Sequence, residues 1–413
     1  MTKLLILGAA GDMGSFVLRD STGYKGYSMI TIGDINEKQA SELIKEISDP
    51  RVRFVRVNAL SHSELVNIMK EHDVVVSCIG PFYIFGPLVA RAAIEAKKPL
   101  IDICDDHGPT QKVLEMDKEA KEAGIPIMLG FGWTPGLSNF LVRYGYDKLD
   151  KDKEIRVNIS WAGGAADSEG LAVIMHVLYA VTGKVPSFLD GKLVDVPAGK
   201  NHQKVEFPEP LGKIGVFDCG HPEPVTIPRY LDGITECTLK GGLTPDWNNK
   251  FAESLKQLHL VQGKRRKTFW AKLVHLTEKL FATGGIAASS ARVDLYGYRD
   301  GREVHLAYAT PSVPMGELTG YPASIAAQLL VEGKIKGTGV IPPEKVNPQP
   351  FFDEMKERGI GMIFDEGGEP EILGRPQPYR PGFFATYGLT ILIIMTFLVF
   401  IIIFGWIISF QLG

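Results

Sequence analysis

Lys3-Leu4-Leu5-Ile6-Leu7-Gly8-Ala9-Ala10-Gly11-Asp12-Met13-Gly14 opens the chain with a short apolar run and a glycine-rich turn. A helical stretch follows from Ser15 to Arg19. A buried strand, a glycine turn and a helix start form the phosphate-binding half of a dinucleotide fold, because the glycines allow a close backbone approach and the helix start attracts anions. The spacing is G-x-x-G-x-x-G, a variant of the commoner G-x-G-x-x-G. We predict that the cofactor contacts in this turn come from Gly8, Ala10, Gly11, Asp12, Met13 and Gly14.

An acidic residue follows at the expected distance. Residues 27–32 read as a second strand, and Asp34 comes about 20 residues after the last glycine of the turn, where a carboxylate can bond the ribose 2′-OH. A carboxylate repels a 2′-phosphate, which favours NAD, although Lys38 is near enough to keep NADP open. In the alternative interpretation Asp34 only caps the helix that starts near Glu37.

Strands alternate with amphipathic helices through the first 130 residues, which is typical of a doubly wound parallel sheet in an α/β fold. The pattern predicts further strands at 53–57, 73–78, 100–103 and 125–129, and helices at 37–47, 61–70, 87–96 and 111–123.

Two more loops follow buried strands directly, and ligands of such sheets bind outside the carboxyl ends of the strands. From the first loop we predict cofactor contacts by Ile79, Gly80 and Pro81, and a substrate contact by Phe82. The second loop is Cys104-Asp105-Asp106-His107, a compact titratable cluster. Neighbouring carboxylates raise the pKa of a histidine, so Asp105 and His107 are candidate catalytic residues and His107 a candidate proton donor. In the alternative, Asp105 or Asp106 caps a helix starting near Thr110 and His107 is solvated.

The turn Trp133-Thr134-Pro135-Gly136 leads into the helix that leaves this domain. Free N–H groups at such a helix start can hold a carboxylate or a carbonyl oxygen. We predict substrate contacts from Trp133 and Thr134 and a catalytic role for Asn139. The alternative is a rigid interdomain turn with an aromatic packing residue.

Beyond this turn the pattern changes to an α+β domain with an antiparallel sheet. Asp190-Gly191 and Asp300-Gly301 read as hairpin turns. Further elements are expected as strands at 155–161, 205–207 and 235–239, and as helices at 169–182 and 316–333. The predicted boundaries are 1–132 for the dinucleotide-binding domain, 133–315 for a substrate and dimerisation domain, 316–364 for a return segment on the first domain, 365–382 for a linker and 383–410 for a transmembrane helix.

The C-terminal stretch is strongly apolar. No charged residue occurs from Phe383 to Gly413, and about 20 apolar residues span a bilayer as a helix. Tyr387 and Trp406 lie near its ends, as interface aromatics do. Arg375 and Arg380 precede the stretch and no charge follows it, so we expect a single-pass anchor with the globular part in the cytoplasm.

Composition excludes some classes of partner. The net charge is −3, so the chain lacks the overall positive charge that is typical of nucleic-acid-binding proteins. The four cysteines form no C-x-x-C pair, so we expect reduced core thiols, and Cys219-Gly220-His221 lacks the second ligand pair that a metal needs. The basic run Lys264–Lys267 reads as a solvated helix start or as a contact with anionic headgroups.

Taken together, these motifs resemble the saccharopine dehydrogenase-like oxidoreductases. The resemblance is carried by Gly8–Gly14, Asp34, and residues 75–82, 101–105, 120–124, 132–139, 319–322 and 343–344. It implies a Rossmann domain that binds NAD or NADP, an α+β domain for substrate and homodimerisation, and a chain that returns to the first domain near its end. Members include amino-acid dehydrogenases acting at a C–N bond, and others resemble membrane-associated or lipid-acting reductases.

We therefore predict an NAD(P)-dependent oxidoreductase that transfers hydride to or from a carbonyl, imine or alkene of a membrane-associated or amphiphilic small molecule. One alternative is an amino-acid dehydrogenase with a soluble substrate. The other is a membrane-anchored NAD(P)-binding scaffold or sensor without catalysis, because a fold does not fix a function.

Overall fold

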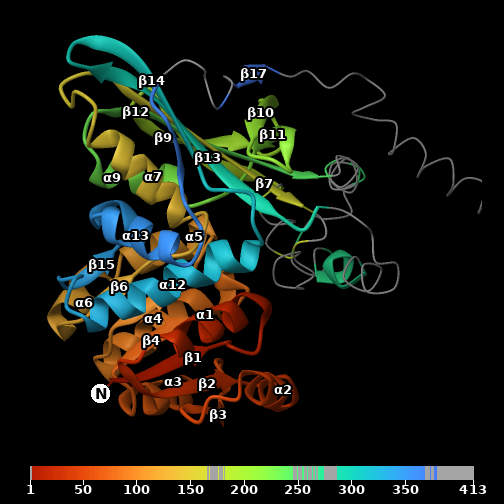
Figure 1. Ribbon diagram of the computed structural model, residues 1–413, viewed down its shortest axis with the longest axis vertical. Helices are drawn as coiled ribbons and strands as arrows, with labels where there is room; N and C mark the ends of the chain where they lie inside the picture. The colour runs from red at the N-terminus through yellow and green to blue at the C-terminus, as the bar shows by residue number, and fades with distance from the viewer. Residues whose placement is uncertain are drawn as a thin grey trace, which may run out of the picture.

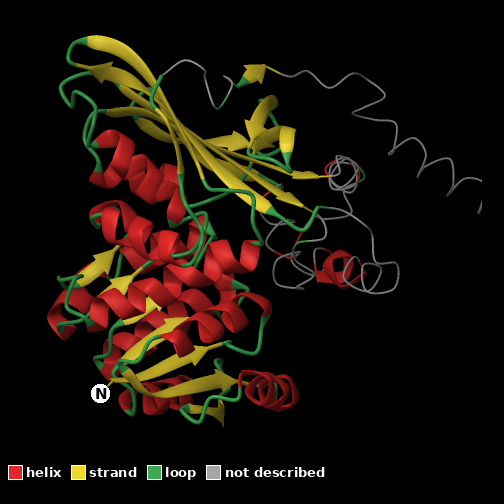
Figure 2. Ribbon diagram, in the orientation of Figure 1, coloured by secondary structure: helices red, strands yellow, loops and turns green. Residues whose placement is uncertain are grey.

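The computed structural model describes two sheets with helices packed between and around them (Figures 1 and 2). It describes residues 2–164, 182–244, 268–273 and 286–367, and isolated positions at 167, 175, 180, 249, 254, 258, 263, 266, 373 and 376–378.

The first sheet is parallel and doubly wound, which confirms the predicted Rossmann-type domain. Its order is β15-β6-β5-β4-β1-β2-β3, so β1 lies between β2 and β4. Its central strands are apolar and fully buried, as both faces are covered by helices. The strands are β1 (Thr2–Leu7), β2 (Tyr27–Asp34), β3 (Val52–Arg56), β4 (Val74–Ser77), β5 (Leu100–Asp102), β6 (Pro126–Met128) and β15 (Gly339–Ile341).

Two helices of this domain differ from the sequence prediction. The helix predicted from Pro87 begins at Phe82, and Pro87 lies inside it at the cost of the one hydrogen bond that proline cannot donate. The helix predicted at 111–123 is two helices, because Met116 leaves the helical conformation at ψ 4°. The helices are α1 (Asp12–Gly23), α2 (Glu37–Ile47), α3 (His62–Lys70), α4 (Phe82–Ala96), α5 (His107–Leu114) and α6 (Asp117–Ala123).

The second sheet is mixed rather than antiparallel, because β7 pairs with β12 in parallel. The two predicted hairpin turns are confirmed. Asp190 and Gly191 join β8 to β9 with φ of 50° and 73°, and Asp300 and Gly301 join β13 to β14 with φ of 54° and 72°. The strands are β7 (Ile155–Gly164), β8 (Lys184–Leu189), β9 (Lys192–Pro197), β10 (Gln203–Phe207), β11 (Gly212–Asp218), β12 (Ile234–Thr244), β13 (Ser289–Arg299), β14 (Arg302–Ala309), β16 (Ile363–Asp365) and β17 (Gln377–Pro378).

Helices from both halves of the described chain lie between the two sheets (Figure 1). They are α7 (Leu137–Tyr146), α9 (Glu223–Tyr230), α12 (Met315–Val331) and α13 (Gln349–Glu357). Gly316 and Gly320 let α12 lie directly on α1, since an added Cβ there would come within 2.1 Å and 2.6 Å of Phe16. After α12 the chain adds β15 to the edge of the first sheet, beside β6.

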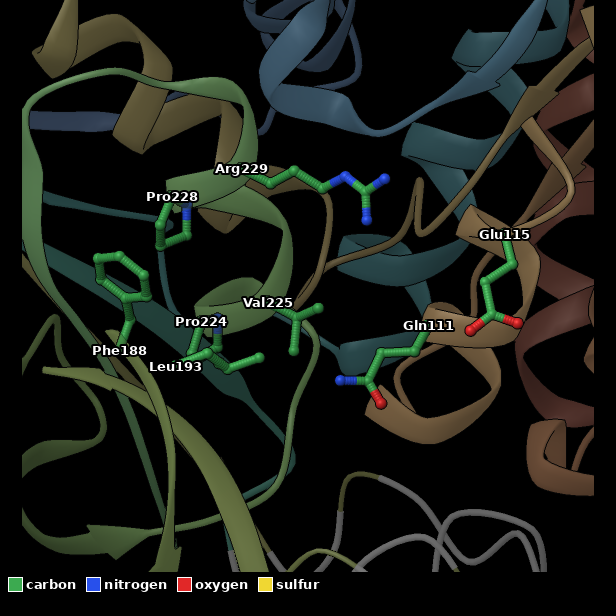
Figure 3. Close-up of a pocket in the computed structure, with 8 residues that line it drawn as sticks. All are labelled: Gln111, Glu115, Phe188, Leu193, Pro224, Val225, Pro228 and Arg229. Carbon is green, nitrogen blue, oxygen red and sulfur yellow. The ribbon is translucent and has the colours of Figure 1, made fainter. Parts of the chain in front are cut away.

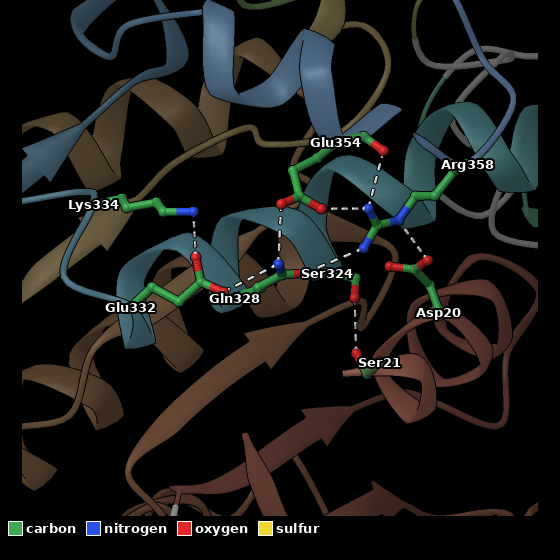
Figure 4. A network of polar contacts seen from close by, with 8 residues as sticks. All are labelled: Asp20, Ser21, Ser324, Gln328, Glu332, Lys334, Glu354 and Arg358. Atoms are coloured by element: carbon green, nitrogen blue, oxygen red, sulfur yellow. Dashed lines mark hydrogen bonds and ion pairs between the residues drawn. The ribbon is translucent and has the colours of Figure 1, made fainter. Parts of the chain in front are cut away.

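Polar contacts hold this returning segment to α1 (Figure 4). Arg358 follows α13 and donates to Asp20 of α1 at 2.6 Å and to Glu354 at 2.7 Å. Ser324 of α12 and Ser21 of α1 share a buried hydrogen bond of 3.0 Å. The first and last parts of the described chain therefore form one packed unit.

The predicted linker at 365–382 is described only in part. Asp365 ends β16, and Gln377 and Pro378 form β17, so these three residues pair with strands of the second sheet. The predicted transmembrane helix at 383–410 lies outside the described residues, as does nearly all of the helix predicted at 169–182. Among the helices that the structure does describe, none is both long enough and apolar enough to cross a bilayer.

Candidate cofactor and substrate site

The glycine turn after β1 has the form of a phosphate cradle. Gly8 adopts a left-handed φ of 78°, and the Gly11 N–H donates to the Gly8 carbonyl at 3.1 Å. A Cβ on Gly14 would lie 2.2 Å from that same carbonyl oxygen, so only glycine allows the helix to approach the turn so closely. Gly11 precedes α1 without a side-chain cap. No capping side chain therefore occupies the N–H groups at the start of α1. This geometry fits a pyrophosphate, which such N–H groups can bind.

Asp34 lies against this turn. Its Oδ2 accepts the Ala10 N–H at 3.1 Å, and its Oδ1 accepts the Asn36 N–H at 2.9 Å. The interpretation of Asp34 as a mere cap is wrong, because the cap of α2 is Asn36, whose Oδ1 accepts the Gln39 N–H at 3.2 Å. The structure thus brings the predicted acidic residue to the predicted turn across 24 residues of sequence, while Lys38 is exposed on α2.

The loop after β4 lies beside the glycine turn. A Cβ on Gly8 would come within 3.1 Å of the Cys78 carbonyl and of the Ile79 side chain. Gly80 and Pro81 are joined by a cis peptide, and Phe82 begins α4. Two of the predicted cofactor-binding segments are therefore neighbours in space.

Two carboxylates in or beside the loop after β5 accept hydrogen bonds from backbone N–H groups and so help to hold the fold. Asp106 does not cap α5 with its side chain, because its Oδ2 accepts the Tyr83 N–H of α4 at 3.1 Å. Asp102, to which no role was assigned from the sequence, accepts the N–H groups of Cys104 at 3.0 Å and Gly130 at 2.9 Å. Burial raises the pKa of Asp102 to about 6 despite these two hydrogen bonds.

His107 lies at the seam between the two domains. It is the first residue of α5, which begins four residues earlier than the predicted start at Gln111. Its ring packs on Gly220 of the second domain, where an added Cβ would lie 3.1 Å from Nδ1. Asp105 is close enough to Glu223 of the second domain to help raise the pKa of that carboxyl. The two candidate catalytic residues of this loop thus face the other domain.

The turn after β6 is packed at the same seam. Thr134 and Pro135 are joined by a cis peptide, and Thr134 is buried. Trp133 is buried in an edge-to-face contact with Trp161, with centroids 6.3 Å apart. Within the described part of the chain the Trp133 indole N–H has no hydrogen-bond partner. A buried donor of this kind is costly to leave unsatisfied, which fits a ligand contact.

Asn139 has a different place from the one predicted. It is fully buried in α7, its Oδ1 accepts the Gly136 N–H at 3.0 Å, and its Nδ2 donates to Glu344 at 2.9 Å. Both ends of the amide are therefore engaged within the protein. In this arrangement Asn139 positions the turn rather than facing a ligand.

Two buried carboxyls at the seam were missed by the sequence analysis. Glu223 accepts the Ser138 hydroxyl at 2.8 Å and lies 3.7 Å from His221 Nδ1. Glu344 comes from the returning segment, in the short 3-10 helix Pro343–Lys345. Burial raises the pKa of Glu223 to about 8 and that of Glu344 to about 7. Isolated glutamates carry no periodic signal, so only the tertiary structure reveals them.

In the predicted stretch Cys219-Gly220-His221, the histidine thus lies beside the Glu223 carboxyl. In the described ranges no group of three or more potential metal ligands comes together. His176 lies outside those ranges.

Comparison with known families fits this geometry. The model of the saccharopine dehydrogenase NADP binding domain matches residues 4–128, and that of the saccharopine dehydrogenase C-terminal domain matches residues 132–360. The chain belongs to the saccharopine dehydrogenase family. The first match spans the glycine turn and Asp34, so a nicotinamide cofactor is supported, and the choice between NAD and NADP remains a prediction.

Individual relatives are distant. Carboxyaminopropylagmatine dehydrogenase of Synechocystis is 20% identical over 390 residues, covering 87% of this chain and 96% of that protein. The lipid droplet localized protein of Caenorhabditis elegans is 25% identical over 140 residues, covering 32% and 33%. Apo saccharopine dehydrogenase (L-Glu forming) of Saccharomyces cerevisiae superposes with a TM-score of 0.64 at 15% identity, covering 89% of this chain and all of that one, which shows a shared fold.

Proposed function

We propose that this family member is an NAD(P)-dependent oxidoreductase, held at a membrane by residues 383–410, that acts on a carbonyl, imine or alkene of an amphiphilic substrate. The observation that carries the oxidoreductase assignment is the contact of Asp34 with the glycine turn at Ala10. This contact joins the ribose-binding and phosphate-binding elements at the carboxyl edge of the sheet.

In this proposal one group of residues binds the cofactor and a second group, at the seam between the domains, faces the substrate. Gly8, Gly11 and Gly14 would cradle the pyrophosphate, and Asp34 would bind the adenosine ribose. A bound nicotinamide cofactor supplies or accepts the hydride. His107 would hold or deliver the proton at the seam, where Gly220 of the second domain covers its ring. Trp133, buried against Trp161, would supply an apolar contact to the substrate.

The amphiphilic substrate is supported by the chain's end and by one relative. Residues 386–410 are almost continuously apolar, as expected of an anchor. The relative from Caenorhabditis elegans is a lipid droplet localized protein. An enzyme of a soluble metabolite gains little from an anchor, whereas an enzyme of a membrane-borne substrate gains local concentration.

A second candidate is an amino-acid dehydrogenase acting at a C–N bond. It is favoured by the relative named carboxyaminopropylagmatine dehydrogenase and by the buried Glu223 carboxyl, which suits a substrate nitrogen. A non-catalytic sensor is separated from both enzymes by turnover, because a sensor binds the cofactor and never oxidises it.

Homodimerisation through the second domain is also proposed, and light scattering of the purified protein tests it.

Fluorescence titration with NADH and NADPH tests the core of the proposal, with Asp34→Ala and the exposed Lys38→Ala as matched variants. Tight NADH binding that Asp34→Ala weakens at least tenfold supports the site and NAD. Preference for NADPH that Lys38→Ala reduces assigns the cofactor as NADP. Binding of neither cofactor overturns the oxidoreductase assignment.

A further inference from the structure

A groove of about 540 Å³ runs along the seam between the two domains, starting one helical turn beyond His107 (Figure 3). Gln111 of α5 and Glu115, the residue that caps its C-terminus in helical conformation, form one wall. They follow His107 at intervals of four residues, which places all three on one face of the helix. The other wall comes from α9 and the β8–β9 hairpin of the second domain. The groove is lined by Gln111, Glu115, Phe188, Leu193, Pro224, Val225, Pro228 and Arg229.

The wall from the second domain is mostly apolar. Phe188 and Leu193 come from the hairpin, and Val225 from the first turn of α9. Leu193 is 47% exposed, although large apolar side chains are usually covered. Covering such a surface with an apolar chain is favourable by roughly 25 cal/mol per Å². This wall therefore fits an aliphatic or aromatic part of a ligand.

The polar side chains of the groove carry opposite charges on opposite walls. In Figure 3 Arg229 extends from α9 toward α5 and Gln111 extends from α5 toward α9, while Glu115 lies on the α5 side of the groove. None of these three side chains makes a hydrogen bond or ion pair within the described part of the chain, and the Arg229 guanidinium only packs 5.8 Å from the Tyr230 ring. Arg229 and Glu115 thus lie on opposite walls of the groove without forming an ion pair with each other.

We propose that this groove binds the non-reacting part of the substrate, an apolar chain that carries a zwitterionic group. The anionic end, a carboxylate or a phosphate, meets Arg229, and the ammonium meets Glu115, with the Gln111 amide between them. The apolar chain lies on Phe188, Leu193 and Val225. This inference rests on the proposed function, because the proposed proton donor His107 places the reacting atoms at the inner end of the groove.

Charge complementarity selects the zwitterion over simpler amphiphiles. A purely anionic group at Arg229 would face the Glu115 carboxylate across the groove, and a purely cationic group at Glu115 would face the guanidinium. Like charges brought together in this way disfavour the wrong ligand. Only a ligand with both charges satisfies both walls at once.

Calorimetric titration of the full chain in nanodiscs tests the proposal, with the heats from empty nanodiscs subtracted. The probes are octylphosphocholine and 2-aminooctanoate as zwitterions, octyl phosphate as an anion and octyltrimethylammonium as a cation. The variants are Arg229→Gln and Glu115→Gln, with the exposed Lys112→Gln of the same helix as the matched control. All three replaced side chains are exposed, so the variants are expected to fold, and thermal melting verifies this.

We expect the wild type to bind at least one zwitterion about tenfold more tightly than either singly charged probe. Arg229→Gln should lose about tenfold and then prefer the cation, Glu115→Gln should lose a similar factor and prefer the anion, and Lys112→Gln should match the wild type. The better of the two zwitterions distinguishes a phospholipid-type head from an amino-acid-type head. Equal binding of octyl phosphate and both zwitterions, or unchanged affinity in both variants, would overturn the assignment.

NADH affinity, measured in the same samples, separates this inference from the proposed function. NADH binding without zwitterion binding overturns only the assignment of the groove. Zwitterion binding that depends on Arg229 and Glu115, in a protein that binds neither NADH nor NADPH, supports the groove and overturns the oxidoreductase function.

Discussion

Asn139 Nδ2 donates to Glu344 Oε2 at 2.9 Å across 205 residues of sequence, and both side chains are fully buried. Arg143 of the same helix adds a second contact, donating to the Glu344 backbone carbonyl at 3.0 Å. These bonds tie the start of α7, and with it the turn that carries Trp133 and Thr134, to the returning segment. The candidate substrate site is therefore held in place by α7 and by the returning segment together.

Replacing Glu344 with Gln should change how stability depends on pH. Burial raises the pKa of Glu344 to about 7. Between pH 4.5 and 7 the unfolded carboxyl releases its proton while the folded one keeps it, so the wild type loses free energy of unfolding as pH rises, by about 3 kcal/mol at most. Glutamine mimics the protonated acid and should melt several degrees higher than the wild type at pH 8 but not at pH 5. The exposed Glu357→Gln is the control, and parallel pH curves for wild type and Glu344→Gln would contradict this account.

Replacing Gly14 with Ala should abolish cofactor binding. The added Cβ would lie 2.2 Å from the Gly8 carbonyl oxygen and 2.7 Å from Ala9 Cα, so α1 must move away from the turn. We expect the NADH dissociation constant to rise at least 100-fold in a fluorescence titration. Gly23→Ala, at the other end of the same helix, meets nothing within 4 Å and should bind like the wild type. Equal losses in the two variants would point to a general effect on α1 instead.

Removing Arg358 should destabilise the protein more than removing an exposed arginine of the same domain. Arg358 is 18% exposed and its partner Asp20 is 10% exposed, so Arg358→Ala leaves a largely buried carboxylate without its cation. We expect a loss of about 3 kcal/mol in the free energy of unfolding. Arg19 pairs with Glu46 at 40% and 61% exposure, and Arg19→Ala should cost less than about 1 kcal/mol. Chemical denaturation of both variants checks the ranking.

Truncation after Pro381 should release the protein from membranes. The full chain is expected to sediment with lipid vesicles, and the truncated protein to remain in the supernatant and bind NADH as tightly as before. A cut after Ile363 is less suitable, because it removes Glu366, which forms ion pairs with Lys148 and Arg299. Sedimentation of both forms would mean that residues 382–413 are not what binds the membrane.

The sequence predicted the dinucleotide-binding half well because its signals are local. The strand, the turn at Gly8–Gly14 and the acidic Asp34 follow one another at fixed spacing, and each depends on backbone conformation or on strand order. The same holds for the hairpin turns, where Asp190-Gly191 and Asp300-Gly301 adopt the left-handed conformations that their residue types allow.

The predictions from sequence failed where the partner of a side chain comes from a distant part of the chain. Asp106 reads as a cap for α5, yet its Oδ2 accepts the Tyr83 N–H of another helix. Asn139 was predicted to be catalytic, yet its side-chain amide donates to Glu344. The second sheet reads as antiparallel, but its two central strands β7 and β12 are parallel, because the order of strands depends on crossovers that hairpin signals do not encode.

The sequence by itself determined the family, the cofactor turn and the apolar C-terminal stretch, because backbone conformation, helix and strand period and bilayer length are all encoded in neighbouring residues. Only the tertiary structure decided which side chains meet at the seam. It brought His107 against Gly220, buried Glu223 and Glu344 beside α7, and set Arg229 across a groove from Glu115. These pairings join segments that lie 85 or more residues apart. The free energy of packing two domains together selects them, and no local sequence pattern records it.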